Sequence, residues 1–435
     1  MIGIYGHGSA RDQICCLRLV EELGDDFKFY DGGTNPALAR AAWSVPAQQM
    51  SAHDLAQACK ADGISLMFVT DALVLQADTV DILAKEGIQI LAPSRHAALL
   101  EGRKSLMKKL MVEAGVPTPD AWIASSADQA KALLRENWRD GHRYVVKTDP
   151  LITDAIHRAM VPETLIESLQ DVDEEMEALH LAHAPEQVLI EQRIDGFETS
   201  VHVIWDGETY VLMPPVRDYK RVGDGDTGPN TYGAASVACG RGFAPELDRQ
   251  LRERIIEPAL NHIRNAGYAY RGFVYFGVML CDDGPVLLEI NVRPGNPEFL
   301  ALLGLLKSDF ADLIRHAANG NLAVADIRWH EDSYCGAVFA MGEGYPQTMT
   351  PPRAIISGLE QALSEGYTVV EDVAATDDGA FVVSGGRVAA TVALGSSLEE
   401  VRLKVLDRLS AIEFKGKHFR SDLGYGIADE LFASA

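Results

Sequence analysis

The stretch VLLEINVRPGNPEF (286–299) starts as an apolar run and then carries a polar side chain at every second position, at Glu289, Asn291 and Arg293. Side chains two residues apart in a strand point to the same face. We therefore expect a carboxylate, an amide and a guanidinium to converge there. The opposite face would pack into the core through Leu288, Ile290 and Val292. An edge strand with one solvated face explains this window equally well, so the rest of the chain has to decide.

The length and charge of the chain limit its class. With 435 residues, it is too long for a single hydrophobic core and predicts about three domains. A hydrophobic fraction of 47% and a charged fraction of 23% are typical of a soluble globular protein. The formal net charge of −24 would repel nucleic acid and anionic membranes. A local basic pocket for a small phosphorylated ligand is compatible with this charge.

The sequence predicts neither a membrane span nor a cysteine-based zinc site. No stretch has the apolar length of a membrane-spanning helix. The first residues, MIGIYGHGSARD (1–12), lack the basic start and apolar region of a signal peptide. The cysteines show no CxxC or Cys/His spacing, which indicates buried thiols in a reducing cytoplasm. They are Cys15, Cys16, Cys59, Cys239, Cys281 and Cys335.

Short apolar segments alternate with amphipathic ones through the first hundred residues. The expected strands are 2–5, 27–31, 64–70 and 88–93, and the expected helices include 13–23 and 54–59. This alternation predicts a small parallel sheet with helices on both faces. The turn GHG (6–8) follows the first strand, where backbone N–H groups at a helix start can bind an anion. The third glycine of a dinucleotide fingerprint is missing, so a tight turn without a ligand is an equal alternative.

The remaining chain mixes helices, strands and one polar loop. In order, we expect a basic helix at 101–119, a strand at 144–149, an acidic helix at 161–184, two strands paired across a glycine turn within 188–205, a strand at 210–216, a polar loop at 217–236, a helix at 246–266 and a strand at 272–280. The polar loop concentrates charge and glycine, which indicates ligand contact. In the tail, Gly385 and Gly386 would join two strands within 381–394 as a hairpin.

Several polar residues suit a site for a nucleotide and a metal. Mg²⁺ takes oxygen ligands and commonly bridges a few protein oxygens to nucleotide phosphates, and Glu289 and Asn291 supply a carboxylate and an amide oxygen. Lys104 and Lys147 are point charges able to neutralise phosphate oxygens. Glu198, after a glycine turn, is placed to accept ribose hydroxyls. Each lysine alone is more typical of a solvated surface.

The order of these segments resembles that of the ATP-grasp ligases, and among them the phosphoribosylamine–glycine ligases. The matching motifs are EGRKSLMKK (101–109), GVPTP (115–119), YVVK (144–147), VLIEQRIDGFETS (188–200), RDYKRVGDGDTGPNT (217–231), VLLEINVRPGNPE (286–298), GYP (344–346), SGGRVAATVALG (384–395) and FRSDLG (419–424). The resemblance therefore runs from about residue 88 nearly to the end, and is weaker before that.

The resemblance implies a multidomain protein of mixed α/β and α+β class. It implies an N-terminal parallel α/β domain at 1–100 and a linker helix with a small lid subdomain at 101–190. The large ATP-grasp subdomain, with the metal and nucleotide site, would occupy 191–328, and a small β-rich domain 329–435.

Carried onto the matching positions, the resemblance implies residue roles, with ATP and Mg²⁺ or Mn²⁺ as cofactors. Nucleotide binding would fall to Lys104, Lys147, Glu191 and Glu198, and metal binding to Glu289 and Asn291. Catalytic groups at the acceptor pocket would be Arg293, Lys220 and Asp218. Substrate contacts would come from Asp226, Asn230, Tyr232, Gly295 and Asn296. The alternative for Arg293 is an ion pair with Glu298 or Asp218.

One departure from the family pattern lies in the loop that closes over the phosphates. The family has a glycine-rich segment of the type DGLAAGKGV, where this chain has DPLITDAIHRAMV (149–161). Pro150 has no N–H group and Ile156 adds bulk, whereas glycine amides approach phosphate closely. His157 and Arg158 would replace the missing amides as side-chain donors, and we assign Arg158 to nucleotide binding. Alternatively, the lid is reshaped or catalysis is impaired.

The other departures lie at substrate contacts. VTDALV (69–74) replaces the family's GPExPL, which helps to hold the sugar-phosphate amine, and GHGSARDQ (6–13) replaces GSGGREHA. TGGMG becomes TYGAA (231–235), and RFGDPE becomes RPGNPE (293–298). The metal strand and both lysines are intact. The changes therefore point to an altered substrate.

These features predict an ADP-forming carboxylate–amine ligase that works through an acyl phosphate, since a carboxylate is a poor electrophile until it is phosphorylated. It would join a small carboxylate, such as an amino acid, to an amine other than phosphoribosylamine in specialised biosynthesis. The alternatives are an authentic phosphoribosylamine–glycine ligase of purine synthesis and a nucleotide-binding protein without turnover. The expected partners are small-molecule substrates, with no nucleic acid or membrane, and the protein would be a monomer or homodimer.

Overall fold

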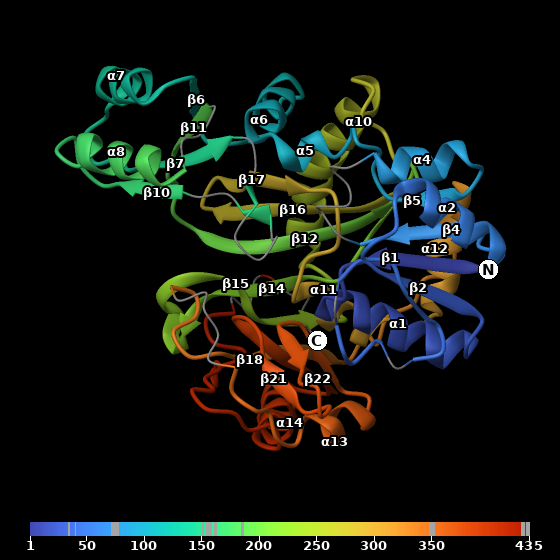
Figure 1. Cartoon of the computed structure of the whole chain (residues 1–435). Coiled ribbons are helices and arrows are strands. Elements are labelled where there is room, and N and C mark those ends of the chain that lie inside the picture. Colours follow the sequence, from blue (N-terminus) through green and yellow to red (C-terminus); the bar gives the residue numbers. More distant parts are fainter. Residues whose placement is uncertain are drawn as a thin grey trace.

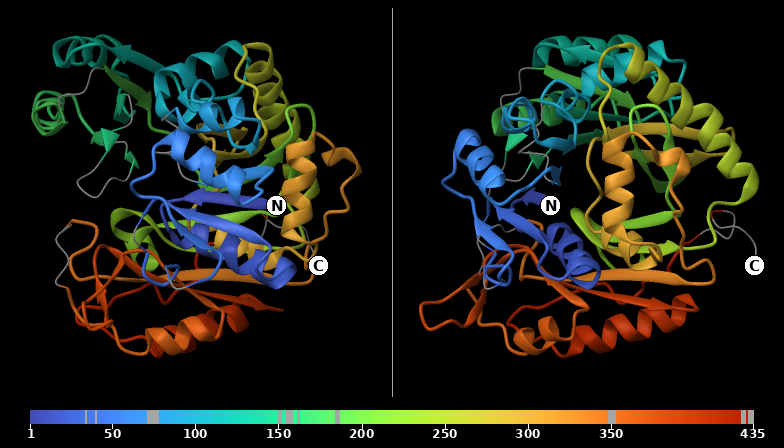
Figure 2. Two further views of the ribbon diagram at one scale, coloured as in Figure 1. Left: turned by 45° about the vertical axis from the view of Figure 1, so that its right-hand side comes forward. Right: turned by 90° about the vertical axis from the view of Figure 1, so that its right-hand side faces the viewer.

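The computed structural model is described in ten segments of the chain. They are residues 1–33, 35–39, 41–70, 78–149, 152–153, 159–160, 163–183, 187–347, 353–427 and 431. Figure 1 shows the whole chain, and Figure 2 gives two further views.

The N-terminal domain contains a parallel sheet, as the alternating sequence predicts. The sheet has five strands, because a short strand at 44–46 joins the four that were expected. Its strands, in spatial order, are β3 (Ser44–Pro46), β2 (Phe27–Asp31), β1 (Ile2–Gly6), β4 (Leu66–Val69) and β5 (Gln89–Leu91). Its helices are α1 (Ala10–Leu23), α2 (Ala52–Ala61) and α4 (Thr79–Lys85). Alternate strand residues enter two separate hydrophobic clusters, for example Phe29 in one and Tyr30 in the other, so both faces of the sheet are covered.

The start of α1 uses backbone N–H groups that the sequence left open for an anion. Ser9 Oγ accepts a hydrogen bond from the Asp12 N–H (3.3 Å), and the Asp12 carboxylate accepts one from the Ser9 N–H (2.9 Å). This reciprocal capping box begins the helix. These two amides therefore bond within the protein, as the alternative of a tight turn without a ligand predicts.

The small subdomain is an antiparallel sheet covered by two helices. Its strands, in spatial order, are β10 (Glu163–Ile166), β7 (Tyr144–Asp149), β11 (Gln187–Gln192) and β6 (Ala121–Ala124), and its helices are α7 (Ala127–Asn137) and α8 (Val172–His183). A separate pair of short strands consists of β8 (Ile152–Thr153) and β9 (Ala159–Met160). The helix expected at 161–184 begins later than predicted, at Val172, because residues 163–166 form strand β10 and pair with β7.

A second antiparallel sheet of nine strands forms the centre of the molecule. Its spatial order is β17 (Gly284–Asn291), β16 (Gly272–Cys281), β12 (Phe197–Trp205), β14 (Val216–Gly223), β15 (Thr227–Cys239), β18 (Tyr334–Met341), β22 (Arg387–Gly395) and β19 (Thr368–Val370), with β13 (Tyr210–Leu212) beside β12. Strands from the last hundred residues thus continue the sheet that carries the expected metal strand (Figure 1).

Helices surround this sheet and connect it to the two smaller regions. They are α5 (Leu99–Gly102), α6 (Lys104–Glu113), α9 (Pro245–Gln250), α10 (Glu257–Asn265), α11 (Glu298–Leu305), α12 (Phe310–Asn319), α13 (Leu359–Ser364) and α14 (Leu398–Ser410). A π-helical segment, Leu251–Ile256, joins α9 to α10, which confirms the continuous helix expected at 246–266.

Three sequence-based expectations about strand pairing are wrong. The two strands within 188–205 belong to different sheets, because the chain crosses at Gly196 from β11 to β12. Residues 217–236 are mostly the paired strands β14 and β15 rather than a loop. The strands on either side of Gly385 and Gly386 do not form a hairpin, since β21 (Phe381–Val383) pairs with β20 (Val373–Ala375) and β22 pairs with β18.

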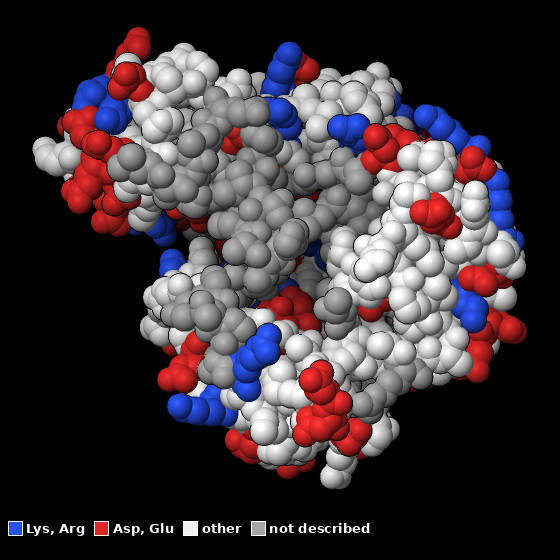
Figure 3. All heavy atoms as spheres, in the orientation of Figure 1, with Lys and Arg blue, Asp and Glu red and all other residues white. Residues whose placement is uncertain are grey.

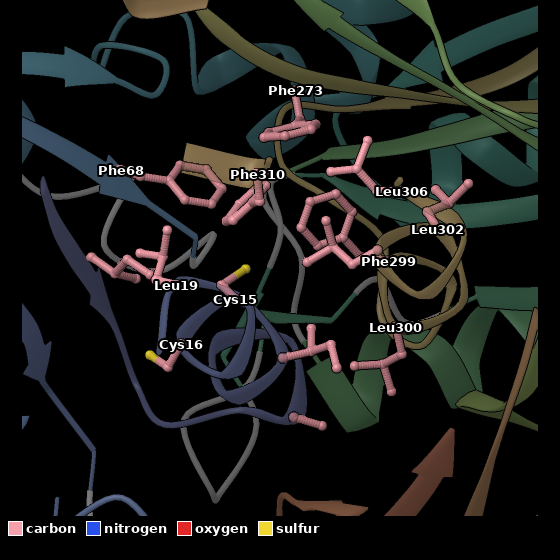
Figure 4. Close-up of a cluster of buried hydrophobic side chains, with 14 of the residues drawn as sticks. Cys15, Cys16, Leu19, Phe68, Phe273, Phe299, Leu300, Leu302, Leu306 and Phe310 are labelled. Atoms are coloured by element: carbon pink, nitrogen blue, oxygen red, sulfur yellow. The ribbon is translucent and has the colours of Figure 1, made fainter. Parts of the chain in front are cut away.

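Aromatic packing fixes the N-terminal domain against the central sheet. Phe68 of β4, Phe273 of β16, Phe299 of α11 and Phe310 of α12 lie in one buried cluster (Figure 4). The ring centroids of Phe273 and Phe299 are 4.9 Å apart, and those of Phe68 and Phe273 5.5 Å. Figure 2 shows the N-terminal domain also against the C-terminal strands, where Gln13 Oε1 accepts a hydrogen bond from the backbone N–H of Val370 (2.7 Å).

The cysteines are mostly buried, as the sequence predicts. All six cysteines are free thiols; five are buried and Cys281 is partly exposed, so the expectation of burial is wrong for that residue alone. No helix in the described part of the chain is long and apolar enough to cross a membrane.

Candidate active site

Glu289 and Asn291 converge on one face of β17, as the alternation of the strand predicts. The Asn291 Nδ2 group lies 3.4 Å from Glu289 Oε1. Across the sheet, Glu289 is opposite Gly277 and Asn291 opposite Tyr275, both on β16. A Cβ atom added to Gly277 would lie 2.8 Å from Glu289 Cγ, so glycine at this position leaves the room that the carboxylate occupies.

The apolar side of the same strand differs from expectation at one residue. Ile290 and Val292 are buried as expected, but Leu288 is only partly buried and Leu287 takes the core position. The register shifts between Gly277 and Val278, so that Leu287 pairs with Val278 and Leu288 is the extra residue of a bulge. The bulge moves the polar and apolar sides of the strand out of strict alternation just before Glu289.

Lys104 is the first residue of α6 and is directed to the expected metal strand. Its Nζ lies 2.7 Å from Glu289 Oε2, and its backbone N–H donates to Asp149 Oδ1 (2.9 Å). The attraction of Lys104 holds the pKa of Glu289 well below its usual range, against the effect of burial, with Lys220 adding to the attraction. Glu289 is therefore an anion at neutral pH, as an oxygen ligand for a cation must be.

A second, buried charge cluster joins the small subdomain to α6. Glu191 on β11 is 2.7 Å from Lys147 on β7 and 2.5 Å from Lys108 on α6. Burial alone would raise the pKa of Glu191, but Lys147 and Lys108 outweigh it and lower the pKa to about 2. Sequence reasoning missed Lys108, although it lies one helical turn after Lys104 and so shares its face.

The predicted catalytic residues on β14 meet carboxylates on neighbouring elements. Lys220 pairs with Glu198 of β12; burial would lower the pKa of Lys220, but Glu198 outweighs it and the pKa rises well above its usual range. Burial, together with the nearby charge of Glu298, raises the pKa of Asp218 well above its usual range. Asp218 Oδ1 is buried and has no hydrogen-bond partner among the described residues.

Arg293 is held by an ion pair, but with a different partner from the two considered in the sequence. Its Nε lies 3.1 Å from Oε1 of Glu101, and the other oxygen of Glu101 accepts the backbone N–H of Val292 (3.0 Å). The partner belongs to α5, which packs beside β17 but lies far away in sequence. Arg293 thus forms an ion pair, as the alternative predicted, but its partner is Glu101 and not Glu298 or Asp218.

Gly295 and Asn296 form the turn after β17 and are both held by side chains. The Gly295 N–H donates to His202 Nε2 (3.1 Å), which can accept because burial, with the nearby Arg293 charge, lowers the pKa of His202 to about 3. Asn296 Nδ2 donates to Glu371 Oε2 (2.8 Å). Tyr232 is near this turn and donates its backbone N–H to Tyr345 Oη (3.0 Å).

Asp226 and Asn230, both predicted to contact substrate, pair with residues other than Glu289. Asp226 accepts from Arg217 (2.8 Å) and from the fully buried Arg420 (2.5 Å), which ties the β14–β15 turn to the C-terminal segment. Asn230 is exposed and lies opposite Arg221 in the strand pair. Their substrate roles remain predictions.

Arg158, His157 and the last four residues of VTDALV (69–74) lie outside the described residues. The face that carries β7, β11 and the C-terminal strands is hollowed between these two regions, and acidic atoms gather inside the hollow (Figure 3).

The donor set fits a magnesium–nucleotide site. Among the described residues, no three His, Cys, Asp or Glu side chains gather in a way that would enclose a metal ion. Mg²⁺ usually takes only one or two protein oxygens and fills its remaining positions with water and phosphate. Glu289 and Asn291 supply that number, and Lys104 supplies a cation beside them.

Comparisons with known proteins agree with this geometry. Residues 102–299 match the family model "Phosphoribosylglycinamide synthetase, ATP-grasp (A) domain", and residues 335–426 match the C domain of the same synthetase. A phosphoribosylamine–glycine ligase of Brucella melitensis is 33% identical over 92% of this chain and 92% of its own length. The chain belongs to the phosphoribosylamine–glycine ligase family.

Other members of the family extend this agreement. The trifunctional purine biosynthetic protein adenosine-3 of Gallus gallus is 34% identical over 85% of this chain, which spans 36% of that longer protein. The crystal structure of phosphoribosylamine–glycine ligase from Thermotoga maritima has a TM-score of 0.77, with 25% identity, and the match covers 97% of this chain and 99% of that one. These matches confirm the expected fold class and an ADP-forming ATP-grasp ligase that makes a C–N bond, with ATP and Mg²⁺ as the family's cofactors.

Proposed function

We propose that this family member is itself a phosphoribosylamine–glycine ligase, which joins the carboxyl group of glycine to the amine of phosphoribosylamine and converts ATP to ADP and phosphate. The supporting observation is the Lys104–Glu289–Asn291 cluster, set within a chain that matches such ligases along nearly their whole length. This reading replaces the altered-substrate hypothesis as the leading one.

The residues on the sheet face have separate tasks in this reaction. Glu289 and Asn291 would hold Mg²⁺, which when bound neutralises charge on the nucleotide phosphates. Lys104 pairs with Glu289 and Lys147 with Glu191, and both lysines would contact phosphate oxygens. The carboxylate of the substrate is phosphorylated first, the amine then attacks the acyl phosphate, and phosphate leaves.

Arg293 would act on the reacting carboxyl group. Its ion pair with Glu101 and the bond from Glu101 to the Val292 backbone fix the guanidinium beside the end of β17. A cation that is already oriented stabilises the oxyanion of the tetrahedral intermediate without having to reorganise. Positioning and charge neutralisation thus supply most of what the protein contributes.

A second candidate function is favoured by the N-terminal domain. Ligands of parallel sheets bind at the carboxyl ends of the strands, and here Asp31 ends β2 while Asp12 lies in the first turn of α1. Both side chains are buried, and burial raises the pKa of Asp31 to about 6. Carboxylates at this edge disfavour a phosphorylated amine. The second candidate is therefore a ligase that joins a small carboxylate to a different amine in specialised biosynthesis.

One assay separates the two candidates. The purified protein is supplied with ATP and Mg²⁺, and either with glycine and phosphoribosylamine or with a panel of small carboxylates and unphosphorylated amines. ADP and the amide product are measured by mass spectrometry. Amide formation that requires both glycine and phosphoribosylamine supports the first candidate. Amide formation only with another amine supports the second, and nucleotide binding without any amide would contradict both.

A further inference from the structure

A buried ion pair of the C-terminal strands lies directly behind the turn that follows β17. Arg387 is the first residue of β22, and Glu371 follows β19. Their side chains are 5% and 9% exposed. Arg387 Nε donates to Glu371 Oε1 (3.0 Å), and a second guanidinium nitrogen contacts the same carboxylate.

The third nitrogen of Arg387 binds the backbone of two different segments. Its Nη1 group donates to the carbonyl oxygens of Tyr232, Gly233 (3.3 Å) and Asn296 (2.9 Å). Tyr232 and Gly233 belong to β15, and Asn296 to the turn after β17. A planar guanidinium with five donors is suited to joining several acceptors at fixed angles.

Glu371 completes the arrangement by holding the side chain of the same turn. Its Oε2 accepts the Asn296 amide (2.8 Å), so the ion pair holds both the backbone and the side chain of Asn296. Glutamate at 371 requires a donor at 296. An aspartate there would place a second carboxylate against the first, at hydrogen-bond distance and without a proton between them.

The two segments that Arg387 joins touch beside Asp218. A Cβ atom added to Gly233 would lie 2.3 Å from Pro297 Cδ and 3.2 Å from Asp218 Oδ1. The Gly233 backbone therefore lies against the Pro297 ring and the Asn296 carbonyl next to Asp218, and any separation of the two segments would change this contact. A buried ion pair adds little net stability. This ion pair bonds instead to the backbone of Gly233 and to the backbone and side chain of Asn296.

We propose that Arg387 and Glu371 are positioning residues of the ligase reaction. They fix the Gly233 backbone against the Asn296–Pro297 turn and so set the shape of the pocket that receives the carboxylate and the amine. The inference rests on the proposed function, because it takes the carboxylate and the amine to bind beside Asp218 and Gly295. It assigns a task to the C-terminal strands that the nucleotide and metal residues do not perform.

The experiment compares Arg387→Lys and Glu371→Gln with the wild-type enzyme. KM is measured for ATP, for the carboxylate and for the amine, together with the thermal unfolding midpoint. We expect KM for the carboxylate or the amine to rise about tenfold or more, the size of effect expected when hydrogen bonds to a charged group are lost. KM for ATP should change less than about twofold, because Lys104 and Glu289 do not contact the pair.

Arg408→Lys is the matched control. Arg408 is also bonded to β22, through the carbonyl oxygen of Val392, and its guanidinium covers the Tyr367 ring at 3.8 Å. Its loss should lower the unfolding midpoint and leave all three KM values unchanged. The same pattern in Arg387→Lys and Glu371→Gln would show a purely structural pair and overturn the proposal. Glu371→Gln is nearly isosteric, so it keeps the test valid if Arg387→Lys does not fold.

A charge exchange tests the specific contact. Asn296→Asp should raise the substrate KM values by placing two carboxylates together, and adding Glu371→Gln should recover part of the loss, because an amide then faces a carboxylate again. A double variant no better than Asn296→Asp would refute the pairing. Kinetics use whichever carboxylate and amine the wild-type enzyme joins fastest, so failure with glycine and phosphoribosylamine refutes the proposed function while these comparisons still decide the role of the pair.

Discussion

Replacing Glu191 by glutamine tests the buried charge cluster that joins the small subdomain to α6. The pKa of Glu191 is about 2 in the folded protein, against an ordinary value of 4.5. Each pKa unit corresponds to about 1.4 kcal/mol, so the ionised carboxylate contributes roughly 3 kcal/mol of stability. Because the folded pKa is the lower one, this contribution is present above pH 4.5 and is lost as the pH falls toward 2.

We therefore expect wild-type protein to exceed Glu191→Gln in free energy of unfolding by about 3 kcal/mol at pH 7, and the difference to shrink below pH 4.5. Urea unfolding is followed at several pH values by pulsed hydrogen exchange in β7 and β11, which separates the small sheet from the rest of the chain. The control is Glu246→Gln. The Arg249 and Gln250 side chains lower the pKa of Glu246 to about 2 as well, but Glu246 is exposed and screened by solvent. A difference that is independent of pH, or equally large for the control, would refute the reasoning.

Three further outcomes are expected at the metal site. Glu289→Gln combined with Asn291→Ala abolishes turnover while the unfolding midpoint stays close to that of the wild type, because the apolar side of β17 is unchanged; a normal rate would contradict the metal assignment. Gly277→Ala lowers kcat/KM about tenfold or more, because the added Cβ would lie 2.8 Å from Glu289 Cγ and would displace the Glu289 side chain. Wild-type kinetics in this variant would show instead that the carboxylate can move freely. EDTA stops amide formation and added Mg²⁺ or Mn²⁺ restores it, with no change in the unfolding midpoint of the nucleotide-free protein; a lower midpoint would indicate a structural metal instead.

Local pattern in the sequence accounts for much of the site. Strand alternation placed Glu289 and Asn291 together, and helix and strand patterns gave the N-terminal sheet. The bulge at Leu288 was not predictable, because it depends on the register with β16 and not on the strand itself. Lys108 could have been found, since a residue four positions after Lys104 shares its helix face.

Long-range contacts account for what the sequence did not reveal. The Arg293–Glu101 pair spans 192 residues, and Arg387 reaches Asn296 across 91. Nothing near either residue in sequence marks its partner. The hairpin expected at Gly385 and Gly386 failed for the same reason: two adjacent strands found better partners in different sheets.

The shared sheet has a consequence for how the chain matures. Strand β18 can pair with β22 only after residue 395 has been synthesised, whereas the lysines and the metal strand emerge much earlier. Strand β15 can pair with β18 only after residue 341 has been synthesised. Until then β15 presents an open edge, the kind of surface on which chains associate wrongly. We expect ribosome-bound chains that stop before β18 to be prone to aggregation and inactive. We also expect the enzyme to gain its activity in one late step of folding.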